Sequence, residues 1–161
     1  MEENILIVYY SWSGNTRTIA SLIRDKTGGI LFEIQPEIPY VNDYNAVVTQ
    51  AKKEIHAGYS PALNTSLNDI TPYDTIYIGS PNWWSTIAPP VKTFLSGLDF
   101  SGKTILPFLS HGGGGRGRII QDISDFCTGA NILDALEVSG DGGRSLQTEV
   151  SVWLRKTGIV K

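Results

Sequence analysis

Hydrophobic and polar positions along this chain follow two alternating periods, which predict strands and helices in turn. Continuous apolar runs are typical of strands that helices cover on both faces. Such runs predict five strands, at residues 5–10, 30–34, 75–79, 104–110 and 132–138. The last of these carries the polar residues Asp134 and Glu137, which indicates the edge of a sheet.

Apolar residues that recur every three or four positions predict a helix after each strand. The first helix is expected to end at Gly28-Gly29, the second to begin behind a cap at Asn42 or Asp43, and the third to open at Pro89-Pro90. Residues 57–72 form a long polar connection. The apolar positions of the helices are Ile19, Ala20 and Ile23; Tyr44, Val47, Val48, Ala51 and Ile55; Val91, Phe94, Leu95 and Leu98; Ile119, Ile120, Ile123 and Phe126; and Leu146, Val150, Trp153 and Leu154.

Strands that alternate with helices predict an α/β protein with a mostly parallel sheet and right-handed crossovers. The length of 161 residues fits a single domain, 1–161. Pro107 falls in the middle of the fourth strand. Because proline has no N–H for the strand ladder, we expect it at a bulge or where the flank of the strand is unpaired.

Ligands of open parallel sheets bind at the carboxyl ends of the strands, so the loops after the first, third and fourth strands are the candidate sites. The first loop is Ser11-Trp12-Ser13-Gly14-Asn15-Thr16, at the start of a helix. Its small hydroxyl residues and glycine allow backbone N–H groups to converge on a phosphate, which the helix dipole also favours. The alternative is that Ser13 or Asn15 only caps the helix.

The second loop contains Pro81, Asn82, Trp83 and Trp84. Two adjacent indoles in a loop are costly to expose, and a planar aromatic ligand could cover them by stacking. The alternative is that one or both indoles fill the core or form a protein interface.

The third loop contains Ser110, His111 and a run of four glycines, Gly112 to Gly115, followed by Arg116. Glycines permit a close approach of the backbone to a ligand, and His111 and Arg116 flank them at the ligand end of a strand. The alternative is a mobile surface linker. The sequence from Gly97 to Thr104 also matches a phosphate-binding G-x-x-x-x-G-K-T pattern, but it follows a helix and enters a strand, so we interpret it as a turn.

Composition and charge exclude several classes of protein. The formal net charge of −3 offers no broad basic surface for nucleic acid, and the single cysteine, Cys127, excludes a disulfide framework and a cysteine-built zinc site. No apolar run approaches the roughly 18 residues of a membrane span. The acidic start Met1-Glu2-Glu3-Asn4 does not resemble a signal peptide, so we expect a cytoplasmic protein without a membrane segment.

The three loops together resemble those of the flavodoxin family. Ser11 to Thr16 is similar to the phosphate loop T/S-x-T/S-G-N-T, and Pro81-Asn82-Trp83-Trp84 with Pro89-Pro90-Val91 is similar to the flavin-stacking segment. Ser110-His111-Gly112-Gly113 resembles the third loop of one bacterial subgroup. The resemblance implies a three-layer sandwich with a five-stranded parallel sheet in the order 2-1-3-4-5, in a short-chain form.

The resemblance also implies FMN as the cofactor and assigns roles to the loop residues. Ser11, Ser13, Gly14, Asn15 and Thr16 would hold the phosphate, and Trp12 lies in the same loop. Trp83 and Trp84 would border the isoalloxazine, Pro81 and Asn82 would shape that wall, and Ser110, His111, Gly112 and Gly113 would close the other side.

The implied function is transfer of single electrons between redox partner proteins, a reductase and an acceptor, by a monomer with no substrate chemistry of its own. An FMN-dependent reductase that oxidises NAD(P)H with a quinone or nitro compound is the alternative. A third possibility is a flavin-binding module whose two tryptophans dock another protein. Flavodoxin carriers tend to be strongly acidic, and a net charge of −3 is a weak form of that property.

Overall fold

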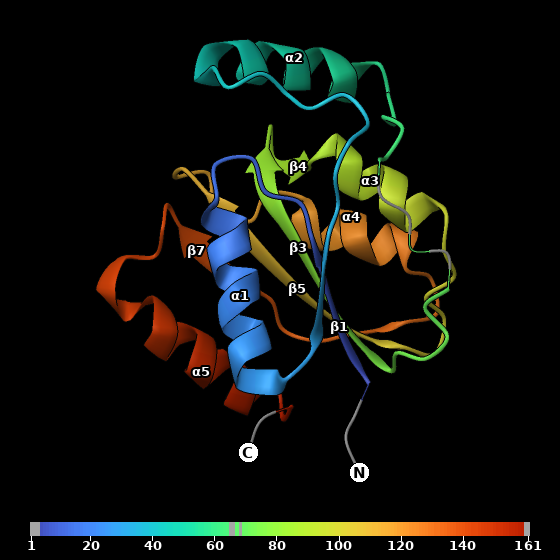
Figure 1. Cartoon of the computed structure of the whole chain (residues 1–161), viewed down its shortest axis with the longest axis vertical. Coiled ribbons are helices and arrows are strands. Elements are labelled where there is room, and N and C mark those ends of the chain that lie inside the picture. Colours follow the sequence, from blue (N-terminus) through green and yellow to red (C-terminus); the bar gives the residue numbers. More distant parts are fainter. Residues whose placement is uncertain (1–3, 65–66, 68, 160–161) are drawn as a thin grey trace.

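The computed structural model describes residues 4–64, 67 and 69–159, so the acidic Met1 to Glu3 and part of the 57–72 connection lie outside it. A parallel sheet forms the centre of the molecule, with its strands in the order β2-β1-β3-β5-β6 and with β7 also paired to β5 (Figure 1). The strands are β1 (Ile5–Tyr9), β2 (Ile30–Glu33), β3 (Thr75–Trp83), β4 (Thr86–Ile87), β5 (Thr104–His111), β6 (Asn131–Ile132) and β7 (Leu136–Ser139). The predicted α/β fold and the strand order 2-1-3-4-5 are confirmed, with β6 and β7 together as the fifth strand.

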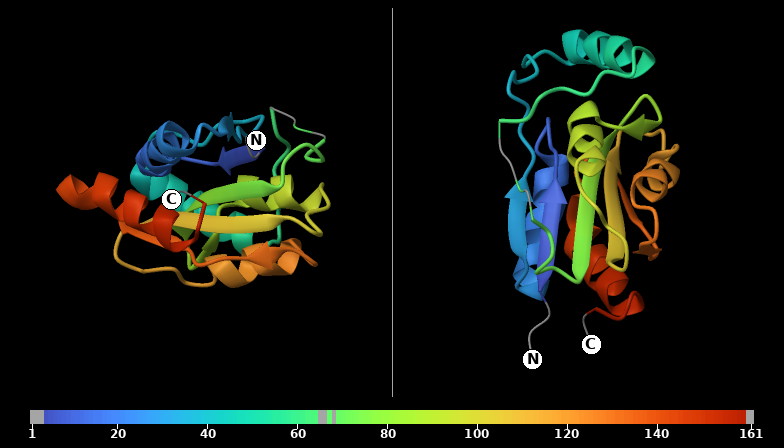
Figure 2. Two further views of the ribbon diagram at one scale, coloured as in Figure 1. Left: turned by 90° about the horizontal axis from the view of Figure 1, so that it is seen from below. Right: turned by 90° about the vertical axis from the view of Figure 1, so that its right-hand side faces the viewer.

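Two layers cover the sheet, because residues alternate between its faces along each strand. On one face, α1 (Asn15–Thr27) and α5 (Leu146–Lys156) pack against Ile7 and Tyr77. The short 3-10 helix η1 (Gly143–Ser145) directly precedes α5 in the chain. On the other face, α3 (Pro89–Ser96) and α4 (Ile119–Phe126) pack against Val8 and Ile78. The two views of Figure 2 show the resulting three layers.

Helix α2 (Tyr44–His56) lies outside these layers, across the carboxyl end of the sheet (Figures 1 and 2). Asp43 caps it by accepting hydrogen bonds from the backbone N–H groups of Asn45 and Ala46, which decides between the two predicted caps. The chain segments before and after α2 cover the sheet beside α3 and pair with each other at Pro36 and Leu63. Of the 13 residues of α2, only Val47 and Ala51 are buried.

The fifth strand is interrupted, whereas the sequence predicts one strand over 132–138. β6 pairs with Thr104 and Ile105 of β5, and β7 pairs with the stretch from Phe108 to His111. Pro107 falls between these two pairings, so the prediction that it lies where the flank is unpaired is confirmed. Backbone groups two residues apart point to the same neighbouring strand. The carbonyl of Ile105 faces the side of β5 on which β6 and β7 lie. An N–H at position 107 would point to the same side, into the unpaired gap between β6 and β7.

The third strand is longer than predicted and continues into a hairpin. β3 runs to Trp83 rather than ending at Gly79, since Asn82 and Trp83 pair antiparallel with Ile87 and Thr86 of β4. The predicted loop is thus mostly strand. The G-x-x-x-x-G-K-T stretch forms the turn between α3 and β5, as predicted. Within the described ranges, no helix has both the length and the apolar character needed to cross a membrane.

Candidate functional site

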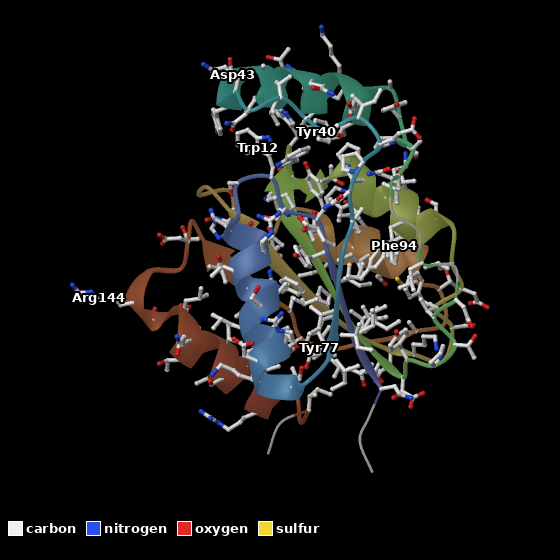
Figure 3. The ribbon with its side chains drawn as sticks, in the orientation of Figure 1. Trp12, Tyr40, Asp43, Tyr77, Phe94 and Arg144 are labelled. Carbon is white, nitrogen blue, oxygen red and sulfur yellow. The ribbon has the colours of Figure 1, made fainter. Side chains whose placement is uncertain are left out.

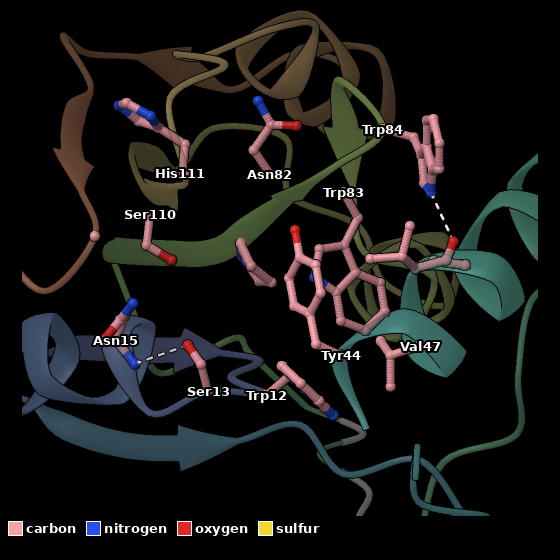
Figure 4. Close-up of a pocket in the computed structure, with 15 residues that line it drawn as sticks. Trp12, Ser13, Asn15, Tyr44, Val47, Asn82, Trp83, Trp84, Ser110 and His111 are labelled. Atoms are coloured by element: carbon pink, nitrogen blue, oxygen red, sulfur yellow. Dashed lines mark hydrogen bonds between the residues drawn. The ribbon is translucent and has the colours of Figure 1, made fainter. Parts of the chain in front are cut away.

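A pocket of about 460 Å³ opens at the carboxyl end of the sheet, which is the expected place for a ligand in this architecture. Its walls come from the loop after β1, the end of β3, the end of β5 and helix α2 (Figure 4). The volume lies within the range of about 300–1,000 Å³ typical of small-molecule sites. The lining residues are Trp12, Ser13, Asn15, Tyr44, Val47, Val48, Ala51, Pro81, Asn82, Trp83, Trp84, Ser110, His111, Gly112 and Gly140.

The loop after β1 leaves the start of α1 open to an anion. Gly14, with φ 98°, is the N-cap and supplies no side-chain acceptor to the first turn. The Ser11 hydroxyl accepts from the N–H of Gly14 at 3.1 Å, and the Ser13 hydroxyl accepts from the N–H of Asn15 at 3.4 Å. The N-cap position is thus taken by Gly14 rather than by Ser13 or Asn15, and the Ser13 hydroxyl accepts only from the first N–H of the helix. Helix N–H groups without a capping side chain are suited to bind phosphate.

A buried hydrogen bond joins this loop to the end of β5. The hydroxyl oxygens of Thr16 and Ser110 are 2.8 Å apart, although 94 residues separate the two in sequence. Thr16 is almost fully buried, so its side chain holds the loop in place from below rather than facing the pocket. The first and third predicted loops are thus locked together at the base of the site.

The β3–β4 hairpin closes through a turn with two residues in the left-handed region. Trp84 has φ 55° and Ser85 has φ 68°, and Trp83 pairs with Thr86 across the turn. Such two-residue hairpin turns favour Asn or Gly at the central positions, because side chains with a Cβ are strained there. Neither preferred residue is present, so the turn must be held by its surroundings.

Replacement of Ser85 by glycine is expected to stabilise the protein by about 0.5–1 kcal/mol, because it removes the Cβ from a left-handed position. Urea unfolding monitored by tryptophan fluorescence measures the change. Ser85→Ala is the matched control, since alanine keeps the Cβ and should give no gain. A loss of stability in Ser85→Gly would show that the serine side chain contributes contacts that outweigh the strain.

Trp83 is fixed by other aromatic rings beneath the pocket. Its ring meets Tyr10 edge-on at 5.6 Å between centroids and Tyr40 at 5.0 Å. Burial and the nearby carboxylate of Glu54 raise the pKa of both tyrosines far above the ordinary value, with burial the larger cause, so both stay neutral. Trp83 is partly buried against the core and also lines the pocket, which suits it to form a fixed aromatic wall.

The glycine-rich loop is tied to the hairpin. The Asn82 amide donates to the carbonyl of Gly115 at 2.7 Å and accepts from the N–H of Ser85 at 2.8 Å. A Cβ at Gly117 would lie 2.7 Å from the backbone of Ser85, which explains why glycine is needed at that position. The loop is therefore joined to the hairpin at Gly115 and lies against it at Gly117.

His111 has a defined protonation pattern when neutral. Its Nδ1 accepts a hydrogen bond from the N–H of Gly113 at 3.0 Å. The proton of the neutral ring is then on Nε2, which makes His111 a hydrogen-bond donor at the pocket wall.

Ten of the fourteen predicted site residues line the pocket, and four lie behind it or beside it. Those lining it are Trp12, Ser13, Asn15, Pro81, Asn82, Trp83, Trp84, Ser110, His111 and Gly112. The other four are Ser11, Gly14, Thr16 and Gly113. Trp84 is half exposed and is turned toward α2, whereas Trp83 lies at the centre of the pocket wall (Figure 4).

Sequence reasoning missed the contribution of α2. Tyr44, Val47, Val48 and Ala51 form an apolar wall of the pocket, and Gly140 adds a contact after β7. The helical spacing of these α2 residues was visible, but the same spacing is produced by a helix that packs on the core. Figure 3 shows Trp12 and Tyr40 between α2 and the body of the molecule.

Other chemistries find no support among the described residues. No cluster of three His, Cys, Asp or Glu side chains that could hold a metal ion occurs in the described ranges. Cys127 is buried, and burial raises the pKa of its thiol to about 12, so it is an unreactive core residue. The pocket therefore depends on aromatic walls, hydroxyl groups and backbone N–H groups.

Comparison with known proteins agrees with this geometry. The family model described as Flavodoxin matches residues 4–157. No curated protein matches the chain at the level of sequence. A protein from Bacteroides eggerthii, described as a candidate flavoprotein, is 27% identical with a TM-score of 0.84, over 99% of this chain and 100% of the other.

Two further solved structures are similar. A flavoprotein from Lactobacillus acidophilus in complex with FMN is 25% identical with a TM-score of 0.72, over 94% of this chain and 98% of the other. The oxidised flavodoxin 2 from Bacillus cereus is 21% identical with a TM-score of 0.60, over 93% and 94% of the two chains, and at this identity it supports the fold alone.

Proposed function

Since the chain belongs to the flavodoxin family, we propose that it binds FMN without a covalent bond and transfers single electrons between redox partner proteins. One observation carries the proposal: a single pocket joins the start of α1, where the N-cap is a glycine, to the aromatic wall at Trp83. FMN has a phosphate at one end and a planar aromatic ring system at the other, which matches these two ends. When bound, FMN supplies the electron-transfer chemistry, and the protein supplies binding and orientation.

The residues have separate roles in this proposal. The N–H groups at the start of α1 and the hydroxyl of Ser13 would bind the phosphate, while Ser11, Gly14 and Thr16 shape the loop that presents them. Trp83 would face the ring system, with Asn82 and Pro81 at its border. The Nε2–H of His111 and the backbone of Gly112 would donate to polar atoms of the ring.

The pocket favours the carrier over an enzyme that oxidises NAD(P)H. A nicotinamide dinucleotide carries at least two phosphates, which proteins commonly bind with arginine, lysine or a helix N-terminus. None of the residues that line the described pocket is lysine or arginine. Two helix starts reach it, and that of α2 is already capped by Asp43. We further propose that residues 1–161 act as one domain and as a monomer in the cytoplasm.

The test is the purified protein itself. We expect a yellow protein that releases FMN on denaturation and that oxidises NAD(P)H with a quinone only when a partner reductase is added. Rapid oxidation without any partner would instead establish the FMN-dependent reductase. A colourless protein that cannot be reconstituted with FMN would refute both functions.

A further inference from the structure

Helix α2 forms the roof of the pocket but has few attachments of its own to the body of the protein. The described residues of the segments before and after it, 34–43 and 57–74, form no regular helix or strand, and only two of its thirteen residues are buried. The side chain of its capping residue, Asp43, accepts hydrogen bonds from Asn45 and Ala46 of α2 itself. Its position over the pocket must therefore be set by a small number of contacts with neighbouring elements.

Trp84 makes two of these contacts. Its indole Nε1 donates a hydrogen bond of 2.9 Å to the backbone carbonyl of Val48, in the middle of α2 (Figure 4). The ammonium nitrogen of Lys52, one helical turn further on, lies 5.2 Å from the centre of the Trp84 ring. A cation at this distance over an indole is attracted by the ring. The side chain of Trp84 therefore binds the underside of α2 at two points.

The turn that carries Trp84 is held rigidly. Ser85, the next residue, donates its N–H to the Asn82 side chain and accepts at 2.6 Å from the N–H of Arg118. Both Trp84 and Ser85 have positive φ, a strained conformation that persists only where the surroundings enforce it. The indole of Trp84 is thus presented from a fixed platform on the β3–β4 hairpin.

Hydrogen bonds and ring contacts from other residues hold the two ends of α2. Tyr40 donates a hydrogen bond to Glu54, but Tyr40 lies in the segment that leads into α2. Trp12 contacts that segment at the carbonyl of Val41 and the first residue of the helix, Tyr44. Beyond the other end of α2, Lys92 of α3 donates to the carbonyl of Gly58. In the middle of the helix, Val47 and Ala51 are buried, and Trp84 adds a hydrogen bond to the carbonyl of Val48.

We propose that Trp84 is a positioning residue that holds α2 as the roof of the pocket, whereas Trp83 is the one of the two adjacent tryptophans that faces the ligand. The identity of that ligand as FMN rests on the function proposed above. The attachment of α2 through Trp84 does not depend on it. A roof held in this way is expected to slow the release of the ligand.

Amide hydrogen exchange of the FMN-free protein tests the attachment directly. Trp84→Phe keeps an aromatic ring but has no N–H, so the amides of α2 should exchange about two- to tenfold faster, the change expected for loss of one hydrogen bond. Exchange in β1 and β3 should not change. Trp153→Phe is the matched control, because the Trp153 indole also donates to a backbone carbonyl, that of Asp134, at a site remote from α2.

The FMN-loaded protein tests the division of roles between the two tryptophans. In Trp84→Phe we expect FMN to dissociate faster by a similar factor, while the bound flavin keeps its quenched fluorescence. In Trp83→Leu we expect the quenching to be lost, because the ring that would face the flavin is absent. This opposite pattern is one that general destabilisation would not produce.

Two results would overturn the proposal. One is unchanged α2 exchange in Trp84→Phe, and the other is loss of flavin quenching in Trp84→Phe with quenching retained in Trp83→Leu. If the unmodified protein does not bind FMN, the proposed function fails, and the exchange experiment still decides whether Trp84 holds α2.

Discussion

Riboflavin, which lacks the phosphate of FMN, is expected to bind this protein at least about a thousandfold more weakly than FMN. The phosphate would meet the N–H groups at the start of α1 and the hydroxyl of Ser13, where Gly14 provides no competing cap. A hydrogen bond to a charged group contributes about 1.5–3 kcal/mol, so three such bonds correspond to a factor of roughly a thousand or more.

Titration of the FMN-free protein with each flavin, followed by flavin fluorescence, measures this ratio. Trp83→Leu is the control, because the ring system is common to both flavins and the variant should weaken both to the same extent. Equal affinity for riboflavin and FMN would show that the loop from Ser11 to Thr16 is not a phosphate site.

The second large effect is expected from Gly79→Ala, which should lower the free energy of unfolding by about 2–3 kcal/mol, at the upper end of the usual cost of overpacking a core. A Cβ on Gly79 would lie 2.2 Å from the Cζ atom of Phe108. The Phe108 ring is completely buried and cannot move aside without displacing its neighbours. Gly79 also accepts a hydrogen bond from the N–H of Tyr10, at the end of the strand that leads into the phosphate loop.

Urea unfolding of the FMN-free protein measures this loss. Gly114→Ala is a suitable comparison, since a Cβ there would meet only the Asn82 amide at 3.6 Å and should change stability by less than about 0.5 kcal/mol. If Gly79→Ala were as stable as the unmodified protein, the close packing of Phe108 on β3 would be wrong.

The arrangement of the sheet and the positions of the three loops could be predicted from local patterns. The continuous apolar run of β1 reflects burial of all five of its residues, Ile5–Tyr9, between two layers of helices. Pro107 predicted an unpaired flank of β5 because a proline lacks the backbone N–H that pairing with a neighbouring strand requires. Rules of this kind need no knowledge of distant parts of the chain.

The roof of the pocket could not be predicted in the same way. Val47, Val48 and Ala51 have the spacing of any amphipathic helix, and only the tertiary structure shows that this face meets a pocket. The turn at Trp84 and Ser85 contradicts local turn preferences and exists because Asn82 and Arg118 hold it. The bond between Thr16 and Ser110 likewise joins residues too far apart in sequence for any local pattern to connect.

The broken fifth strand has a consequence for how the molecule behaves at high concentration. An exposed sheet edge is a template on which another chain can add a strand, and long flat edges lead to aggregation. Here β6 has two residues and β7 has four, with a gap opposite Pro107. Glu137, within β7, also carries a charge and forms an ion pair with Arg116. Neither segment is long enough to guide a continuous intermolecular ladder, so this edge disfavours the growth of fibrils.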